Sequence, residues 1–310
     1  MRSITALLLD LFIKNGDRTS DPADRTAYGC LEAWVSIAGN IVIAVLNFFL
    51  GVTLNSIALT AQSIHTASDV VTSGVVLLGF RAASRPPDER HPYGHGRIET
   101  VAALAIAVLL VVVGFEFLGK SLDRIVHGAN VRGNLVVVGI LIAVGLVKEW
   151  MARFSSYLGK VIDSPALEAD AWHHRSDAIA AVLVSVSIAS ASAGYPAVDA
   201  VLGLVVSALI VYTGAKLAWS STSVLVGEGA DPRLIALITR AAESVHGVRS
   251  IHGLNVHDYG GVKIASVHIQ VDPELSVRDS HRIAGAVKYA VRNAISIECV
   301  VHVEPDAPGE

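Results

Sequence analysis

The amino-acid sequence predicts an α-helical membrane protein with six transmembrane helices, followed by a small α+β domain at the C-terminus. Of the 310 residues, 52% are hydrophobic and only 17% are charged, whereas soluble domains carry about 25% charged residues. The mean hydropathy is +0.54, and the apolar residues occur in long blocks, as they do in membrane spans. After Trp219 these blocks give way to shorter helical and alternating patterns. The net charge of −4 gives no indication of nucleic-acid binding.

Six segments are long and apolar enough to cross a bilayer, which takes about 20 residues for each helix. These expected spans are Leu31–Val52, Ser56–Phe80, Glu99–Gly119, Gly133–Phe154, Leu167–Ala193 and Ala197–Trp219. Ahead of them, Met1–Lys14 is expected to form an amphipathic helix at the membrane interface. It does not resemble a signal peptide, because Asp10 interrupts its short apolar run and no small-residue cleavage site follows.

The charges of the loops predict the orientation of the spans. Lysines and arginines gather before the first span and in the loops after the second and fourth spans, and cytoplasmic segments carry such an excess. Both termini are therefore expected in the cytoplasm. The predicted organisation is a cytoplasmic N-terminal segment, a six-helix transmembrane domain and a cytoplasmic α+β domain, at residues 1–30, 31–226 and 227–310.

The C-terminal domain is predicted from its periodicities. Asp231 followed by Pro232 is typical of a helix start, and Gly260-Gly261 between two alternating runs predicts a hairpin. The expected order is αββαβ, with the helices on one face of a sheet, at Asp231–Val245, Val248–His257, Lys263–Val271, Ser276–Asn293 and Ile297–Val303. A domain of about 80 residues is marginal alone, so dimerisation would stabilise it.

Two of the spans carry the same polar pattern. His65 and Asp69 are one helical turn apart in the second span, and His173 and Asp177 repeat this spacing in the fifth. Two imidazoles and two carboxylates suit a tetrahedral cation, above all zinc, and ionisable groups inside spans mark ion pathways. The alternative is that each histidine only pairs with the aspartate of its own helix. The recurrence of the pattern in two spans favours a shared metal site.

Other polar residues near these spans receive simpler interpretations. Asp170 is expected either at the cytoplasmic mouth of the site or as a hydrogen-bonding support for its ligands. His174 is left out of the site because it lies about 100° around the helix from His173. Lys148 and Glu149 lie near the end of the fourth span, where long charged side chains can reach the membrane interface.

The loop after the second span contains a further group of candidate ligands. Asp88, His91 and His95 fall within eight residues, and Pro92 with two glycines lets the backbone fold them together. The alternative is a polar loop whose histidines are simply solvated.

The C-terminal domain is also rich in histidine. A lone histidine in a strand is usually structural, but several histidines with a carboxylate in one small domain favour metal binding. The candidate ligands are His257, His268, His281, His302 and Glu304.

Taken with these motifs, the chain resembles the cation diffusion facilitator family of divalent metal transporters. The resemblance extends from about Phe12 to Glu304. It rests on the αββαβ region with His302-Val-Glu304 and on the motifs Ser63-Ile-His-Thr-Ala-Ser-Asp69, His91-Pro-Tyr-Gly-His-Gly-Arg-Ile-Glu99 and Ala169-Asp-Ala-Trp-His-His-Arg-Ser-Asp177.

The resemblance implies a homodimer in a lipid bilayer, with a transport site at His65, Asp69, His173 and Asp177. It implies export of divalent cations, with protons moving inward as counter-ions. It also implies a loop site matching Asp88, His91 and His95. Finally, it implies a cytoplasmic domain with a ferredoxin-like metallochaperone fold, which binds metal at the dimer interface through the five candidate ligands listed above.

The sequence departs from the family pattern at three positions. Related zinc exporters have aspartate where this chain has Glu304. The family's Leu-Leu-Asp after the sixth span reads Leu225-Val-Gly-Glu228 here, so two outcomes are expected: either Arg97 pairs with Glu228 in place of the usual charge interlock, or the interlock is weaker. Some relatives have Asp or Asn in place of His65, and a histidine there favours zinc.

The expected function is therefore proton-coupled export of a divalent metal cation, with Zn²⁺ first and Cd²⁺, Co²⁺, Fe²⁺ and Mn²⁺ as alternatives. Magnesium and calcium are disfavoured because they prefer oxygen ligands. The expected location is the inner or plasma membrane of a bacterium. The alternative function is a membrane receptor or sensor that binds metal without moving it. The chain is not expected to be an enzyme or to bind nucleotides, since it lacks a Gly-x-x-x-x-Gly-Lys-Ser/Thr motif.

Overall fold

The computed structural model describes residue 5 and residues 22–53, 57–127, 135–192, 197–260 and 262–306. The amphipathic helix expected at Met1–Lys14 lies outside the described residues, apart from residue 5. The chain divides into two compact units. The helical unit holds residues 1–85 and 97–222, and the second unit holds residues 86–96 together with residues 223–310.

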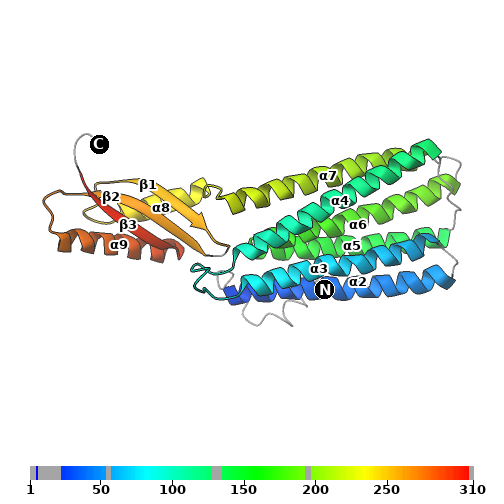
Figure 1. Cartoon of the computed structure of the whole chain (residues 1–310), viewed down its shortest axis with the longest axis horizontal. Helices are drawn as coiled ribbons and strands as arrows, with labels where there is room; N and C mark the ends of the chain where they lie inside the picture. Colours follow the sequence, from blue (N-terminus) through cyan, green and yellow to red (C-terminus); the bar gives the residue numbers. More distant parts are fainter. Residues whose placement is uncertain are drawn as a thin grey trace. The chain divides into compact units, whose positions relative to one another are not determined.

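The helical unit consists of long helices that run side by side (Figure 1). They are α2 (Pro22–Thr53), α3 (Ile57–Ala83), α4 (Arg97–His127), α5 (Leu135–Ile162), α6 (Pro165–Ser192) and α7 (Ala197–Val226). Among the described residues, five helices are apolar and long enough to cross a membrane, namely α2, α3, α4, α5 and α7. The predicted series of six long helices is confirmed, and α6 differs from the others because it buries several polar side chains.

Several helices continue well past their predicted ends. The fourth span is predicted to end at Phe154 and the third at Gly119. Helix α5 instead continues to Ile162, because its last turns bury Leu158 and Ile162 in a core formed with α6. Hydropathy alone misses this continuation because the buried stripe there is narrow and is flanked by polar residues.

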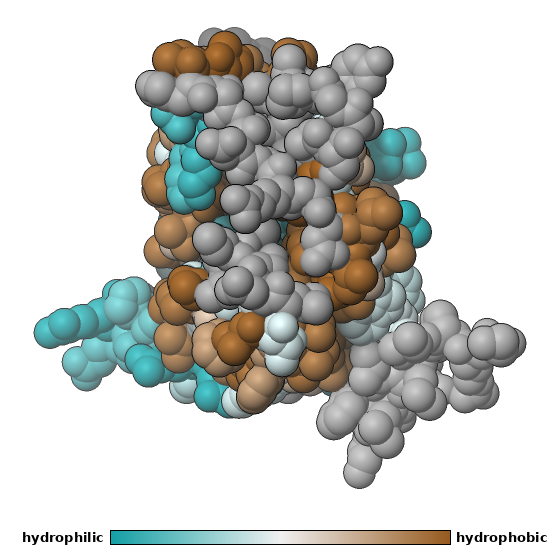
Figure 2. All heavy atoms as spheres, turned by 90° about the vertical axis from the view of Figure 1, so that its right-hand side faces the viewer, coloured by the Kyte–Doolittle hydropathy of each residue, from teal (hydrophilic) through white to brown (hydrophobic). Residues whose placement is uncertain are grey.

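The outer surfaces of the helices are apolar. On α2, Val42, Leu46, Phe49 and Val52 are half exposed or more, at spacings of one helical turn. Similar exposed side chains occur on α4, α5 and α7, and such residues form the brown areas of Figure 2. Apolar stripes of this size on several helices are typical of surfaces that face lipid.

One end of the helical unit is held by a polar cluster. Arg25 on α2 donates two hydrogen bonds to the Glu99 carboxylate on α4, at 3.0 and 2.8 Å. The same guanidinium donates to the carbonyl oxygens of Ile162 and Asp163, where α5 ends. Carbonyls at a helix C-terminus lack partners within the helix, and a cation there is favourable. Asp163 takes a left-handed conformation, with φ 50°, and Ser164 caps the next helix, so α5 and α6 form a tight hairpin.

The second unit contains the αββαβ domain, as predicted. Its elements are α8 (Pro232–Glu243), β1 (Ser250–Asp258), β2 (Lys263–Val271), α9 (Val277–Ile295) and β3 (Glu298–Pro305). Strand β2 is central, antiparallel to β1 and parallel to β3. Alternate residues of β2 are buried against both helices, so the other face of the sheet is open. The turn between β1 and β2 is predicted at Gly260-Gly261. Gly260 has a positive φ of 76°, which favours glycine, and Gly261 lies outside the described residues.

The loop between α3 and α4 also belongs to this second unit. The ring of Tyr93 stacks on Tyr259 beside the hairpin, with 4.5 Å between the ring centroids. Gly96 approaches the hairpin so closely that a Cβ atom there would lie 1.9 Å from the carbonyl oxygen of Gly260. The absence of a side chain at Gly96 therefore lets the loop pack directly against the β1–β2 connection.

Candidate metal sites

The two His/Asp pairs of the predicted quartet converge inside the helical unit. His65 and Asp69 come from α3, and His173 and Asp177 come from α6. The Nε2 atom of His65 lies 3.6 Å from Oδ1 of Asp177 on the other helix. Likewise, Nε2 of His173 lies 3.6 Å from Oδ1 of Asp69. Each histidine thus faces the aspartate of the opposite helix, and His173 also lies 3.8 Å from Asp177 of its own helix.

The quartet offers free ligand atoms in a buried place. Asp69, His173 and Asp177 are each less than 5% exposed. The Nε2 atoms of His65 and His173 are buried without a hydrogen-bond partner among the described residues. Unpaired polar atoms are costly inside a protein unless something binds there. Two imidazole nitrogens and two carboxylates form a ligand set that fits a zinc-like cation.

Lys148 occupies the centre of this site, contrary to the expectation that it extends to the membrane interface. Its Nζ atom lies 2.6 Å from Oδ2 of Asp69 and 2.7 Å from Oδ2 of Asp177, and its side chain is completely buried. An ammonium group between two buried carboxylates neutralises charges that would otherwise be very unfavourable. Sequence analysis missed this lysine because its partners lie on two other helices.

Asp170 and His174 belong to a different cluster. The sequence predicts Asp170 at the mouth of the quartet or as a support for its ligands, and it gives His174 no place in the site. Both are fully buried on α6 and face Glu32 and Ser36 of α2. The sequence does carry an indication of this cluster, since Asp170 and His174 have the same one-turn spacing as His173 and Asp177.

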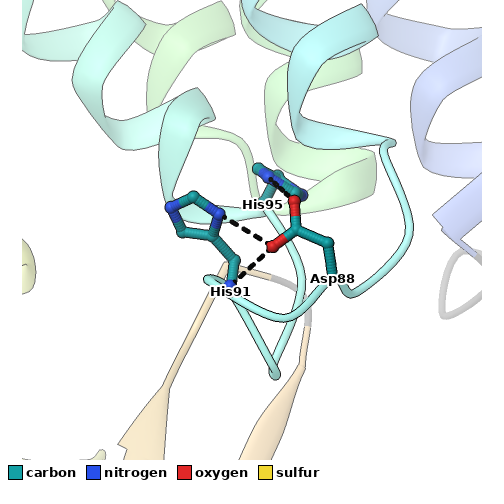
Figure 3. Close-up of side chains that lie close together, drawn as sticks. All are labelled: Asp88, His91 and His95. Carbon is teal, nitrogen blue, oxygen red and sulfur yellow. Dashed lines mark hydrogen bonds and ion pairs between the residues drawn. The ribbon is translucent and has the colours of Figure 1, made fainter.

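The loop candidates lie together in the second unit (Figure 3). Oδ1 of Asp88 lies 3.2 Å from Nδ1 of His91, and Oδ2 lies 3.3 Å from Nε2 of His95. The backbone N–H groups of His91 and Arg90 also donate to Asp88, and the bond from His91 is the main reason that the pKa of this carboxyl is lowered. Asp88 therefore stays ionised between two imidazoles, in an arrangement that can hold a cation.

A third cluster lies on the open face of the sheet. His252, His268 and His302 are neighbours across β1, β2 and β3, and Glu304 lies on the same face. Nδ1 of His268 is 2.7 Å and Nε2 of His252 is 3.0 Å from the Glu304 carboxylate. The hydrogen bond with His268 lowers the pKa of Glu304. Three of these groups, those of His252, His268 and Glu304, are close enough to share one ion.

Two of the expected ligands do not join this cluster, and one unexpected residue does. His257 pairs with Ile264, at the far end of the strand pair from His268, and His281 is exposed on α9, in the layer behind the sheet. His252 takes part because a bulge between His252 and Asn255 sets the register that places it opposite His268. That register cannot be read from the alternation of the sequence.

The two residues of the expected charge interlock lie in different units. Arg97 is the first residue of α4 and belongs to the helical unit, whereas Glu228 follows α7 in the second unit. The interlock therefore stays a prediction. Within the helical unit, the structure shows instead the ion pair between Arg25 and Glu99, which the sequence analysis did not anticipate.

Comparison with known proteins gives two family matches that together cover most of the chain. Residues 33–226 match the cation efflux transmembrane domain, and residues 230–306 match the cytoplasmic domain of cation efflux proteins. An uncharacterized transporter of Methanocaldococcus jannaschii is 33% identical over 271 residues, covering 87% of this chain and 96% of the relative.

Two further relatives have names that refer to metals or magnetosomes. The manganese efflux system protein MneS of Bacillus subtilis is 28% identical over 286 residues, covering 91% of this chain and 97% of the relative. The magnetosome protein MamB of Magnetospirillum gryphiswaldense is 29% identical over 263 residues, covering 84% of this chain and 88% of the relative.

Proposed function

This chain belongs to the cation efflux (cation diffusion facilitator) family, and from that premise we propose that it exports divalent metal cations from the cytoplasm in exchange for protons. The observation that carries the proposal is the convergence of His65, Asp69, His173 and Asp177 from two membrane helices. A buried polar site of this kind is of little use to a receptor that only senses metal, but it is what a carrier needs.

The metal is proposed to be zinc in the first place. Two nitrogen and two oxygen ligands suit a tetrahedral Zn²⁺ ion, and the two unpaired Nε2 atoms support this assignment. Manganese is the second candidate because of the similarity to a manganese efflux protein. Iron, cobalt and cadmium are compatible with the same donor atoms.

The proposed cycle begins with metal displacing positive charge that already lies at the site. The ammonium group of Lys148 lies between the two aspartates, and an incoming dication is proposed to take that position. Histidines must be neutral to bind metal, so loading releases protons and protons on the opposite side of the membrane favour release. The hairpin of α5 and α6 carries Lys148, His173 and Asp177, so the outward step is proposed to move α3 relative to this hairpin.

The second unit is proposed to be a dimerising metal sensor in the cytoplasm. Its open sheet face carries His252, His268, His302 and Glu304, and a second copy of the chain would cover this face. Metal bound there would favour one arrangement of the dimer over another, and the differential affinity for the two arrangements would couple metal concentration to transport. Asp88, His91 and His95 offer a further binding site on the same unit.

Transport into proteoliposomes tests the proposal directly. Wild-type protein should move Zn²⁺, with rates that follow the direction of an imposed pH gradient, whereas His173→Ala and Asp177→Asn should stop transport. Glu243→Gln, which changes an exposed carboxylate on α8, is the control and should transport normally. A channel would respond mainly to voltage, and a receptor would not move metal at all.

The same assay ranks the metals. Zn²⁺, Mn²⁺, Co²⁺, Cd²⁺ and Fe²⁺ are offered separately to the wild type and to His65→Asp. If zinc is the substrate, His65→Asp should lower zinc transport and shift the preference toward harder ions, because it replaces a nitrogen ligand with oxygen. Normal zinc transport by His173→Ala would contradict the site assignment.

A further inference from the structure

A second polar cluster lies beside the quartet, between α2 and α6. Its acidic groups are Glu32 on α2 and Asp170 on α6, and its imidazole is His174 on α6. Ser36 on α2 and Ser155 on α5 complete the cluster. Glu32, Asp170 and His174 are each 0% exposed, so three ionisable side chains are sealed inside the helical unit.

The contacts of the cluster leave part of each group unused. Nε2 of His174 lies 3.1 Å from Oδ2 of Asp170 and 2.9 Å from Oγ of Ser36. Oε1 of Glu32 accepts hydrogen bonds from the hydroxyls of Ser36 and Ser155. Oε2 of Glu32, Oδ1 of Asp170 and Nδ1 of His174 are buried without a hydrogen-bond partner among the described residues.

Buried polar atoms without a hydrogen-bond partner lower the stability of a protein. A buried carboxylate oxygen without a donor loses its hydration and gains nothing in return. Neither Glu32 nor Asp170 forms an ion pair with a lysine or arginine in the part of the chain that the structure describes, whereas the two aspartates of the quartet share Lys148. When both of its carboxyl groups are ionised, the cluster has an excess of negative charge that a cation would balance.

We propose that Glu32, Asp170 and His174 form a second binding site for a divalent cation, with the hydroxyl of Ser36 as a further oxygen ligand. One donor atom from each of the three main residues lies within 4.8 Å of the others. Ligands at 2.0–2.2 Å from a zinc ion are at most about 4.4 Å apart, so small side-chain rotations would close the site. This set contains more oxygen than the quartet and suits Mn²⁺, Fe²⁺ and Co²⁺ as well as Zn²⁺.

The position of the cluster assigns it a role in loading the quartet. Asp170 is closer than Asp177 to Pro165, the start of α6, which is the end proposed to face the cytoplasm. The rise of a helix places these two aspartates about 10 Å apart along α6. The rings of His173 and His174, one from each site, have centroids only 5.8 Å apart. A cation at the second site could thus pass to the quartet in one short step, and this loading role rests on the proposed export function.

Cobalt binding to full-length protein in lipid nanodiscs tests the site itself. The background variant combines Asp177→Asn, His91→Ala, His95→Ala, His268→Ala and His302→Ala, which disables the quartet, the loop cluster and the cytoplasmic cluster. Equilibrium dialysis with Co²⁺ followed by metal analysis should find one retained ion per chain. Adding Glu32→Gln or Asp170→Asn should weaken its binding by a factor on the order of ten or more. The added control Glu116→Gln should leave it unchanged.

The possible results separate binding from transport. A background variant that retains no cobalt, or whose cobalt affinity is unchanged by both Glu32→Gln and Asp170→Asn, overturns the second site. If these variants do not fold, as judged by size exclusion, Ser36→Ala in the same background must still weaken cobalt binding. Should wild-type protein transport no metal while the background variant binds cobalt, the export proposal fails and the site stands. Should Glu32→Gln transport at the wild-type rate at low metal concentration, the loading role fails.

Discussion

The Nζ atom of Lys148 lies 2.7 Å from Oδ2 of Asp177, with both side chains sealed from solvent. The same ammonium contacts Asp69, so a single lysine bridges the two helices that carry the quartet. The positive charge of this lysine balances charge on the two buried carboxylates. Under the proposed function, an incoming metal ion competes with this ammonium group for the same two carboxylates, which has a measurable consequence.

Replacing Lys148 with methionine should destabilise the protein when no metal is added. It should also increase the rise in Tm that added metal causes. The change leaves two buried carboxylates without a counter-ion, at a cost of about 3–5 kcal/mol. Thermal unfolding in detergent should therefore show a lowered Tm that Zn²⁺ raises more than it raises the wild-type Tm. Lys216→Met, on the exposed surface of α7, is the control. Equal stabilisation of Lys148→Met and wild type by Zn²⁺ would show that the lysine does not compete with the metal.

The Arg25–Glu99 ion pair should be important for the stability of the helical unit. Glu99 is almost completely buried, so Arg25→Ala leaves its carboxylate without a partner and frees the carbonyls at the end of α5. We expect a loss of about 3 kcal/mol, seen as a lowered midpoint of chemical unfolding. The double variant Arg25→Ala, Glu99→Gln should recover part of this loss. If the double variant is less stable by the sum of the two single effects, the pair does not act as a unit.

Placing alanine at Gly96 should detach the loop from the hairpin. A Cβ atom at this position would lie 1.9 Å from the Gly260 oxygen and 2.5 Å from the Tyr259 oxygen, so the backbone must move apart. Hydrogen exchange of residues 86–96 should become faster, and the stacking of Tyr93 on Tyr259 should be lost. The comparison is Gly119→Ala on α4, where nothing lies within 4 Å of the added carbon. Unchanged exchange in Gly96→Ala would mean that the loop does not depend on this close approach.

Glu304 should make the second unit sensitive to acid. Its pKa is lowered in the folded protein by the hydrogen bond with His268, so its stabilising contribution is present above the ordinary glutamate value of about 4.3. This contribution is lost as the pH falls through the lower folded value. In full-length protein, Glu304→Gln should make residues 250–305 less resistant to pepsin than in the wild type at pH 5. Between pH 5 and pH 3 the variant should then lose less of its remaining resistance than the wild type does. Glu243→Gln, exposed on α8, should behave like the wild type at every pH.

The sequence was most informative where both partners of an interaction lie on one element. The quartet could be proposed because each of its pairs repeats at one helical turn, and the αββαβ order could be predicted from periodicity and from the caps at Asp231 and Ser276. Local spacing carries this kind of information directly.

The remaining site residues depend on packing between elements. Lys148 contacts its two carboxylates across 79 and 29 residues of sequence, and His174 on α6 contacts Ser36 on α2 across 138 residues. His252 lies in its cluster because a bulge sets the strand register that places it opposite His268. His257 lies farther along the strand, opposite Ile264, and outside the cluster. Side chains at the ends of hydrophobic spans look alike in sequence, whether they extend to the interface or turn inward to a partner.

The assignment of residues 86–96 to the second unit limits how this protein can be recombined with its relatives. The chain passes between the two units at Arg85–Pro86, Gly96–Arg97 and Thr222–Ser223, so the second unit is not a simple C-terminal appendage. A chimera joined only after α7 would place a foreign hairpin against the native Tyr93 and Gly96. Exchange of the second unit between family members therefore requires two grafts, the loop and the C-terminal segment together, and deletion of residues 223–310 leaves the loop without its supporting surface.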